Sequence, residues 1–563
     1  MTPLDWGLFA LYFVGVVSFA LYQSRRNVGV EGYFLANRRM PWWAIGLSVM
    51  ATQASAITFI GTTGQAFDNG MSFIQFYLAL PFAMVILCAV FVPFFYRARV
   101  FTAYEYLEGR FDAKTRALAG FLFLVSRGMG AGIILYAPAI VLSVILGWDE
   151  RVTILVMALV TVAYTMVGGI TAVIWTDVVQ MLMVFGGIAV ALLALFANLP
   201  DGVGVGDVLY IGGIQEMWRS VDFSLDPTNT YTVWTGLLGG LFLFLAYFGT
   251  DQSQVQRYLA ATSLKDSRLS LVFNGFLKVP MQILILSIGV LLFVFYHFEQ
   301  PPLVFSPAEV SVVEASPRAG ELRALQEEHV RVHAQRLEAT QQLLEERHRG
   351  ADVEEWRAVI QGYDERLREL RSSAKGIVAE VRGRASNDVN YVFPTYIVQY
   401  IPMGLLGLLI AVIFAAAMSS LDSEITALSS ATVMDFYRRW FRREASDAHY
   451  LMVARLATMF WGVFAFGVAL YAGQLGSLIE AVNQIGSFFY GSLLGVFLLA
   501  FFVKPANGTG ATVGLLAGMG SVFLVSVGTG ISWLYYNVVG AVVVVVVGTL
   551  VSRLTRGGEG EPA

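Results

Sequence analysis

Runs of apolar residues long enough to cross a membrane recur along the whole of this chain. A membrane-spanning helix needs about 20 consecutive apolar residues, and thirteen segments of the 563-residue sequence come near that length. Hydrophobic residues make up 56% of the chain and charged residues only 14%, against about 25% charged residues in a soluble protein. The sequence therefore predicts an all-α polytopic membrane protein. The candidate spans are 4–24, 42–64, 73–95, 117–146, 152–170, 173–197, 233–256, 270–298, 391–418, 450–472, 478–502, 509–527 and 530–551.

Basic residues alternate between the short connections that join these spans. One set of connections carries 19 Lys and Arg residues, whereas the opposite set carries two, Arg151 and Arg219. Basic residues concentrate on the cytoplasmic side of membrane proteins. The pattern therefore predicts a multi-pass protein of the plasma (inner) membrane, with its N-terminus outside and its C-terminus in the cytoplasm. The opening MTPLDWG has no basic residue, so span 4–24 is expected to be a retained helix rather than a cleaved signal peptide.

One connection is long and polar. Residues 303–388 carry 13 basic and 16 acidic residues. They make up almost all of a predicted insertion, 303–390, which separates two membrane parts, 1–302 and 391–563. A break near 348–352 predicts an antiparallel helical hairpin that stands off the outer face by roughly 45 Å. It is either a passive insertion or a docking surface for an extracytoplasmic protein or a second copy of the chain. Its second helix has apolar residues at coiled-coil spacing, at Trp356, Ile360, Tyr363, Leu367, Leu370, Ala374 and Ile377.

Motifs of soluble catalytic chemistry are missing from the sequence. It has no Walker A motif, no GxSxG motif and no Cys/His cluster, and His329 and His333 lack the glutamate of an HExxH motif. We therefore expect no enzymatic activity, no cofactor and no nucleic-acid partner. Thirteen spans with polar residues inside them favour a transporter of a small solute across the lipid bilayer.

Two spans have polar interruptions. Span 42–64 contains TQAS within GLSVMATQASAITFIGTTG, and span 233–256 ends in FGTDQSQ. Transporters often build their site from interrupted helices at corresponding positions of inverted repeats. These two spans lie five apart, which predicts a five-plus-five inverted repeat over the ten spans that follow the first. Asp251, in the second interruption, is expected to contact substrate or to order the unwound backbone.

The segment FAAAMSSLDSEITALSS, residues 414–430, places polar groups at the end of an apolar helix. Ala416, Ser419, Ser420 and Ser423 share one helix face. Sodium is a hard cation that prefers oxygen ligands, so these hydroxyls and the carbonyls of a helix break would form a weak sodium site. In the alternative interpretation, the hydroxyls bond back to carbonyls of their own helix.

These residues give the chain a resemblance to the sodium:solute symporter family, which has the LeuT-type fold. The motifs that carry it are ATQASAITFIGT, YTMVGGITAVIWTDVVQ, DQSQVQRYLAATS and AAAMSSLDS, and the resemblance covers every span. It implies a main sodium site at the carbonyls of Ala51, Ala54 and Ala416 and the hydroxyls of Ser419 and Ser420.

The resemblance also implies a second cation site. Some relatives hold a second sodium ion beside an aspartate that corresponds to Asp177, and Ser423 matches one of its hydroxyl ligands. The neighbouring position, usually small or hydroxylic in the family, is Asp422 here. A second carboxylate would strengthen a cation site, carry a proton, or face the cytoplasmic vestibule.

The same resemblance limits which solutes the protein is expected to carry. Sugar-transporting relatives have Gln and Glu where this chain has Thr58 and Tyr77, which argues against a neutral hexose. The string ATQASAITF is similar to the bacterial sialic acid branch, and more distantly to the monocarboxylate, vitamin and iodide branch. In the sialic acid branch, the substrate residues correspond to Ser55, Thr58, Gln75 and Arg127.

The position of Arg127 gives a physical reason, independent of the resemblance, to expect an anionic partner. It lies inside span 117–146, among the glycines of SRGMGAG, and a guanidinium within a membrane requires an anionic or carbonyl partner. Its planar fork matches a carboxylate. The alternative is a structural pairing with Asp177 or a helix end.

The sequence therefore predicts a sodium-coupled symporter that imports a carboxylate-bearing solute by alternating access. Sialic acid is the first candidate solute and a small monocarboxylate the second. Two rivals stay open within this class: a proton-coupled symporter that uses Asp177 and Asp422, and a sodium symporter for a neutral solute. The rival from another class is a transporter-like receptor or sensor that signals through the hairpin.

Overall fold

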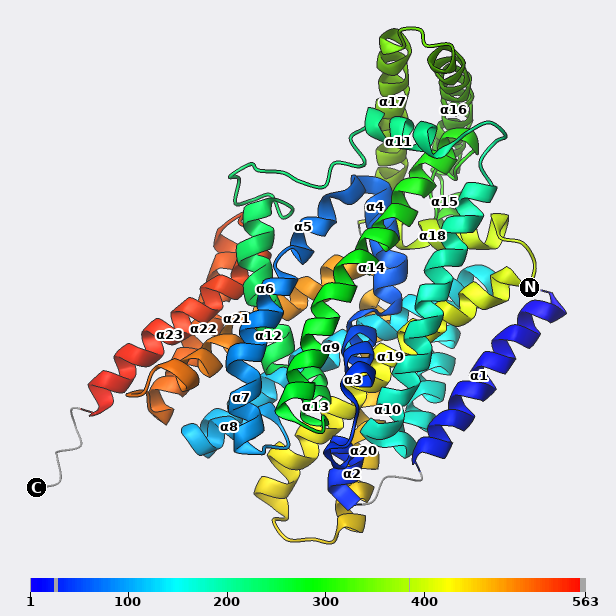
Figure 1. Cartoon of the computed structure of the whole chain (residues 1–563). Coiled ribbons are helices and arrows are strands. Elements are labelled where there is room, and N and C mark those ends of the chain that lie inside the picture. Colours follow the sequence, from blue (N-terminus) through cyan, green and yellow to red (C-terminus); the bar gives the residue numbers. More distant parts are fainter. Residues whose placement is uncertain (1, 25–28, 384, 557–563) are drawn as a thin grey trace, which may run out of the picture.

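Every regular element in the part of the chain that the structure describes is a helix (Figure 1). The computed structural model describes residues 2–24, 29–383 and 385–556, and the only strand-type pairing in them is one isolated bridge between Met40 and Ala261. The predicted all-α class is confirmed. The elements of the first half are α1 (Pro3–Ser24), α2 (Gly29–Leu35), η1 (Ala36–Arg38), α3 (Trp42–Gln53), α4 (Ala56–Asn69), η2 (Gly70–Phe73), α5 (Ile74–Tyr77), α6 (Leu80–Ile86), η3 (Leu87–Phe91), α7 (Val92–Ala98), α8 (Ala103–Arg110), α9 (Ala113–Leu146), α10 (Glu150–Ala197), α11 (Val205–Ile214), η4 (Thr235–Gly239), α12 (Gly240–Thr250), α13 (Gln252–Leu259) and α14 (Leu264–Phe298).

Ten helices within the described residues are long and apolar enough to cross a membrane, whereas the sequence predicts thirteen spans. The numbers differ because some predicted spans are divided into shorter helices, whereas others are joined into one long span such as Ala56–Ala98. Span 42–64 is divided into α3 and α4, and span 233–256 is divided into η4, α12 and α13. The elements of the second half are α15 (Pro307–Glu314), α16 (Ala319–His348), α17 (Glu354–Arg382), α18 (Val389–Tyr400), α19 (Leu405–Ala431), η5 (Thr432–Phe441), α20 (Asp447–Ala472), α21 (Leu478–Phe502), α22 (Gly508–Gly528) and α23 (Leu534–Arg556).

The 48-residue element α10 consists of two helical arms joined at Gly169, where φ is 60° and ψ is 178°. Both ends of α10 contact α18. Glu150 accepts the hydroxyl of Tyr391 at 2.8 Å, and the amide of Asn198 donates to the hydroxyl of Tyr396 at 2.9 Å. A straight helix of this length would extend about 70 Å, so the chain must fold back at Gly169. Glycine suits this position because it adopts positive φ without steric cost.

Two interrupted helices meet near the centre of the molecule. α3 gives way to α4 at Ala54 and Ser55, and α12 gives way to α13 at Asp251, where φ is −82° and ψ is 123°. α19 contacts α3, α4 and α13. Interrupted helices leave backbone polar groups that are affordable within a membrane only where they face other polar groups or a cavity. The two breaks and α19 therefore mark the place to look for a site.

The insertion forms a pair of helices, α16 and α17, at one end of the molecule (Figure 1). The pair is docked on the membrane part rather than standing free, because the connection after α10 also folds against it. The amide of Gln361 donates to the carbonyl of Ile214 at 2.9 Å, and Arg347 pairs with Asp207 of α11. Of the predicted seam, Trp356 and Tyr363 are half-buried, and the buried members are Ile360, Leu367, Leu370, Ala374 and Ile377.

Candidate functional site

The break in the first interrupted helix creates a local polar centre. The helix α3 ends at Gln53, and the extended backbone of Ser55 starts α4, whose third residue Thr58 donates its N–H to the Ser55 hydroxyl at 3.4 Å. The hydroxyl of Thr58 donates back to the carbonyl of Gln53 at 3.1 Å. The sequence TQAS thus supplies its own cap, which is why the helix stops and restarts there.

Two serines of α19 reach across to this break. Ser419 Oγ lies 3.2 Å from the carbonyl oxygen of Ala51 and 3.1 Å from that of Ala416. Ser420 Oγ lies 3.3 Å from each of the same two oxygens. All of these residues are buried, as is Ala54 at the end of the helix. The back-bonding interpretation is therefore incomplete, since both hydroxyls also contact a second helix.

The geometry of this oxygen group suits a hard cation. Oxygens that share one cation at about 2.3–2.6 Å lie roughly 3.3–3.7 Å apart when they are at right angles to each other. The oxygens of Ala51, Ala416, Ser419 and Ser420 have nearly this spacing, at 3.1–3.3 Å. They carry no formal charge, so the attraction for a cation is weak and reversible.

A second polar cluster surrounds Asp177 on the second arm of α10. Its carboxylate accepts the hydroxyl of Ser48 at 2.5 Å and lies 3.3 Å from a guanidinium nitrogen of Arg257. Arg257 also donates to Ser423, which lies 3.2 Å from the hydroxyl of Thr52. The guanidinium thus stands between Asp177 and Ser423, two of the residues that the resemblance assigns to a second cation site.

Arg257 differs from its predicted position. The charge pattern counts it with the basic residues of a cytoplasmic connection, but the structure buries its side chain completely. It belongs to α13, the helix that follows the break at Asp251, and this short helix turns back towards α3 and α19. The carboxylate of Asp177 attracts the guanidinium into the protein interior.

Asp422 is not a member of that ion pair but is linked to it through Ser423. Its carboxylate accepts the hydroxyl of Tyr164 at 2.8 Å, and its other oxygen lies 3.3 Å from the hydroxyl of Ser423. Within the described residues it makes no salt bridge, although it is fully buried. A buried carboxyl group without a cation is either protonated or awaits a cation.

Arg127 is held by two carboxylates. One nitrogen pairs with Asp251, another lies 2.7 Å from Glu424 of α19, and the third donates to the hydroxyl of Tyr490. The guanidinium carbon lies 4.7 Å from the ring centre of Tyr247. The anionic partner that the sequence requires is therefore present within the protein. It is not Asp177, but one of the two carboxylates, Asp251, lies at the helix end between α12 and α13.

A small cavity lies beside this cluster. Its volume is about 60 Å³, below the 300–1,000 Å³ of most ligand sites. A solute the size of a sugar acid can therefore enter only when the surrounding helices move apart. The lining residues are Thr52, Gln53, Ser55, Ile57, Thr58, Phe76, Tyr77, Arg127, Ile134, Leu243, Tyr247, Glu424, Ile479, Val482, Asn483 and Tyr490.

The structure brings Ser55, Thr58 and Arg127 to this cavity, but not Gln75. The amide nitrogen of Gln75 donates to the carbonyl of Tyr231 at 2.7 Å, and its oxygen accepts the N–H of Asp222 at 2.7 Å. The 3₁₀ turn η2 leads into α5 so that Tyr77 lines the cavity instead. Gln75 thus fastens the segment before η4 rather than facing the other predicted substrate residues.

Two further polar clusters join elements near the cavity. Gln65, which lies ten residues after Ser55 in α4, donates to the carboxylate of Glu480 at 3.2 Å. The hydroxyl of Tyr231 donates to the same carboxylate at 2.6 Å. In the second cluster, Asp435 accepts Thr102 at 2.6 Å and Arg116 at 2.8 Å. One cluster therefore joins α4 to α21, and the other joins the start of α9 to η5.

Glu424, Tyr247 and Tyr490 are functional candidates that the sequence analysis does not identify. Glu424 had a usable signal, because it follows Ser420 by four residues and so continues the polar face of α19. The two tyrosines have no such signal, since aromatic residues are common throughout the chain.

Replacing Arg257 by Gln is expected to destabilise the protein by about 3–5 kcal/mol, since it leaves the buried carboxylate of Asp177 without its cation. The double variant Arg257→Gln/Asp177→Asn should recover most of that loss. Thermal unfolding of the detergent-purified variants measures both effects. A single variant as stable as the wild type would show that the ion pair contributes nothing.

Comparisons with known proteins agree with these features. A sequence model of the sodium:solute symporter family matches residues 33–314 and 372–518. A sodium/sialic acid symporter of Proteus mirabilis is 28% identical over 557 residues, covering 96% of this chain and 93% of that protein. Human sodium-coupled monocarboxylate transporter 1 is 28% identical over 532 residues, covering 93% of this chain and 73% of that protein.

A solved structure is similar over the whole length. It is the substrate-bound, outward-open state of a Na⁺-coupled sialic acid symporter, with a TM-score of 0.76 and 26% sequence identity. The likeness covers 98% of each chain. The family model does not match residues 315–371 of the insertion.

Proposed function

Because the chain belongs to the sodium:solute symporter family, we propose that it imports sialic acid or a similar carboxylate-bearing solute together with sodium. The predicted LeuT-type transporter fold and the predicted family are confirmed. The protein is a multi-pass, sodium-coupled secondary transporter and not an enzyme, and sodium is its coupling ion. The proposal concerns the solute, the residues that bind it and the direction of transport.

The observation that carries the proposal is the oxygen group between α3 and α19. A sodium ion held by Ala51, Ala54, Ala416, Ser419 and Ser420 would tie the break in α3 to α19. Ser55 and Thr58 follow that break directly, so the ion would order the residues proposed to bind the solute. Each ligand would then raise the affinity of the other by the same factor.

Electrostatics gives a second reason for coupling. Arg127 lies between Asp251 and Glu424, so the cluster carries one more negative than positive charge when both carboxyl groups are ionised. A solute carboxylate that approaches Arg127 adds another negative charge in a low-dielectric site. Its binding is favourable when sodium enters too, or when Glu424 takes up a proton.

The same pairing favours a second candidate, a sodium symporter for a neutral solute. All three nitrogens of Arg127 already have partners, so an anion must displace one of them. A neutral solute could instead donate a hydrogen bond to the oxygen of Glu424 that has no partner within the described residues.

The orientation of the chain in the membrane determines the proposed direction of transport. The distribution of basic residues supports an outer N-terminus, an outer insertion and a cytoplasmic C-terminus. Inward movement of sodium would then drive uptake. One sodium ion and one carboxylate together carry no net charge, so the membrane potential, worth about 2.3 kcal/mol per charge for each 100 mV, would contribute only when a second sodium ion moves with them.

Binding to the purified protein tests the solute class. Sialic acid, pyruvate and a neutral hexose should be compared in sodium and in potassium buffer by thermal unfolding. Stabilisation by one carboxylate only with sodium supports the proposal. Stabilisation by none of the carboxylates would remove the proposed solute class and leave the family assignment intact.

The variant Asp422→Asn separates a second sodium ion from a proton. The proposed second cation site consists of Asp177, Asp422 and Ser423, and an ion would reach it when Arg257 moves aside. We expect uptake to rise cooperatively with sodium concentration in the wild type and hyperbolically in Asp422→Asn. Uptake into proteoliposomes under separate sodium and proton gradients provides the measurement. Uptake driven by a proton gradient alone, and lost in this variant, would favour the proton-coupled rival.

A further inference from the structure

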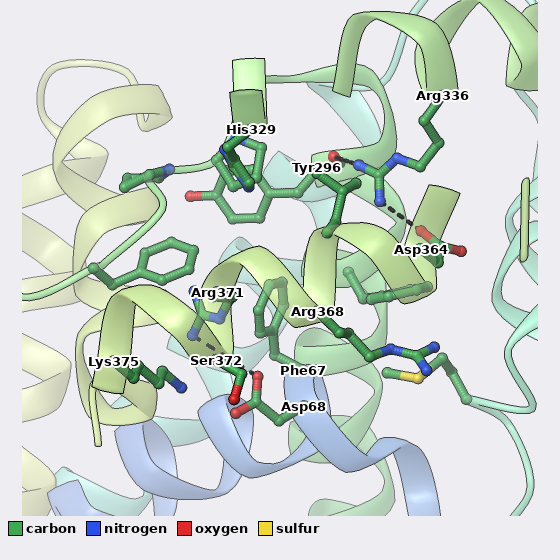
Figure 2. Close-up of a pocket in the computed structure, with 16 residues that line it drawn as sticks. Phe67, Asp68, Tyr296, His329, Arg336, Asp364, Arg368, Arg371, Ser372 and Lys375 are labelled. Carbon is green, nitrogen blue, oxygen red and sulfur yellow. Dashed lines mark hydrogen bonds and ion pairs between the residues drawn. The ribbon is translucent and has the colours of Figure 1, made fainter. Parts of the chain in front are cut away.

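A second and larger cavity lies at the base of the insertion (Figure 2). Its volume is about 380 Å³, within the range of small-molecule sites. It is bounded by α16 and α17 of the insertion and by the ends of α4 and α14. Along α4, Gln65 and its partners Tyr231 and Glu480 lie between the break at Ser55 and the residues Phe67 and Asp68, which line this cavity. The cavity is therefore separate from the transport site.

The cavity is rich in positive charge. Arg336, Arg368, Arg371 and Lys375 line it, together with Asp68 and Asp364. Burial, helped by the positive charges of neighbouring residues, lowers the pKa of His329 in its wall to about 4. This histidine is neutral at physiological pH and adds no positive charge.

The carboxylates nearby do not use all of these donors. Arg336 lies 2.7 Å from Asp364, while Arg371 and Lys375 share Asp388 at 2.8 Å and 3.0 Å. Within the described residues, the Nε of Arg336 has no hydrogen-bond partner although the residue is 95% buried.

The hydroxyl of Tyr296 supplies another free donor. Tyr296 is 98% buried and lines the cavity, and its hydroxyl likewise has no hydrogen-bond partner among the described residues. A buried donor without a partner costs about 1–3 kcal/mol. Two such donors in one cationic cavity indicate that a ligand with acceptor oxygens completes it.

Part of the cavity wall is apolar and aromatic. Phe67, Phe293 and Phe305 line it, with Pro301 and Pro302. The guanidinium carbon of Arg371 lies 4.7 Å from the ring centre of Phe305 and 5.8 Å from that of Phe67. A ligand that fits must therefore combine an anionic group with a flat apolar body.

We propose that this cavity binds a small aromatic carboxylate. The carboxylate would accept hydrogen bonds from Arg371 and Tyr296, and the ring would pack against Phe67 and Phe305. Arg336 and Arg371 lie in the segment outside the family match, so the site belongs to the insertion of this chain rather than to the shared transport core. Such a ligand would join α17 to the end of α4.

Benzoate is the probe for this site. Isothermal titration of the full-length protein in sodium-free potassium buffer keeps the sodium-dependent transport site out of the measurement. We expect benzoate to bind at least 10-fold more tightly than benzamide, which lacks the charge, and than acetate, which lacks the ring. Equal binding of benzoate and benzamide, or no binding of benzoate, would overturn the proposal.

Three variants locate the binding. Tyr296→Phe removes only the hydroxyl without a partner and should weaken benzoate about 5-fold, the typical value of one hydrogen bond. Arg371→Gln should weaken it at least 10-fold, since a charged donor is lost. Arg366→Gln is the matched control, because Arg366 is an exposed residue of the same helix that pairs with Glu328 instead. Unchanged affinity in Tyr296→Phe would place benzoate elsewhere and refute the site.

Discussion

Replacing Ser419 and Ser420 together by alanine is expected to abolish sodium-stimulated uptake at the sodium concentration that half-saturates the wild type, while the protein stays folded. The two hydroxyls contribute the side-chain oxygens of the proposed sodium site and contact Ala51 on the neighbouring helix. The loss of one ligand should reduce sodium affinity roughly 10-fold, which equals about 1.4 kcal/mol. The loss of both should reduce it roughly 100-fold. Uptake of labelled solute into proteoliposomes at increasing sodium concentration measures this shift.

Ser429→Ala is the matched control for that experiment. Ser429 is also buried in α19, but its hydroxyl donates to Ala454 of α20 at 2.8 Å instead of facing the break in α3. Its replacement should leave sodium affinity within about 2-fold of wild type, since it loses one ordinary hydrogen bond. If the double variant kept the sodium affinity of the wild type, the proposed main site would be wrong.

Replacing Arg127 by Gln is expected to cost both stability and transport. The change leaves Asp251 and Glu424 buried without their shared cation, which should destabilise the protein by about 3–5 kcal/mol. It also removes the guanidinium proposed to receive the solute carboxylate. We expect uptake below one tenth of wild type and a clearly lower unfolding temperature.

The double variant Arg127→Gln/Glu424→Gln distinguishes these two losses. It removes one cation and one carboxylate, so most of the lost stability should return. Asp251 still accepts the N–H and hydroxyl of Ser253 at 2.8 Å and 2.7 Å. Transport should stay low if Arg127 binds the solute. Recovery of uptake together with stability would show that Arg127 has only a structural role.

The interrupted helices could be predicted because they leave a local trace in the sequence. TQAS and FGTDQSQ place polar and small residues within apolar runs, and the structure has its breaks at Ala54 and Asp251. The Ser419–Ser420 pair could be placed on one face of a helix for the same reason. Local periodicity determines which side of a helix is polar.

Contacts between distant segments could not be predicted in this way. Arg257 lies near other basic residues in the sequence, which predicts an exposed position. Its burial is explained by the ion pair with Asp177, which is distant in the sequence. Gln75 was aligned by family pattern, but a short 3₁₀ turn before it changes which side chains face the cavity. Both residues differ from the local expectation because tertiary packing, and not the local sequence pattern, decides which groups a polar side chain contacts.

The docked insertion has a practical consequence for imaging. A transporter of this mass has little structure outside a detergent micelle, so individual particles are hard to align in electron micrographs. α16 and α17, of 30 and 29 residues, would each extend about 45 Å. They are fastened to the membrane part through Gln361 and Arg336. The chain therefore carries its own fiducial marker for single-particle reconstruction, without a fused domain or an antibody fragment.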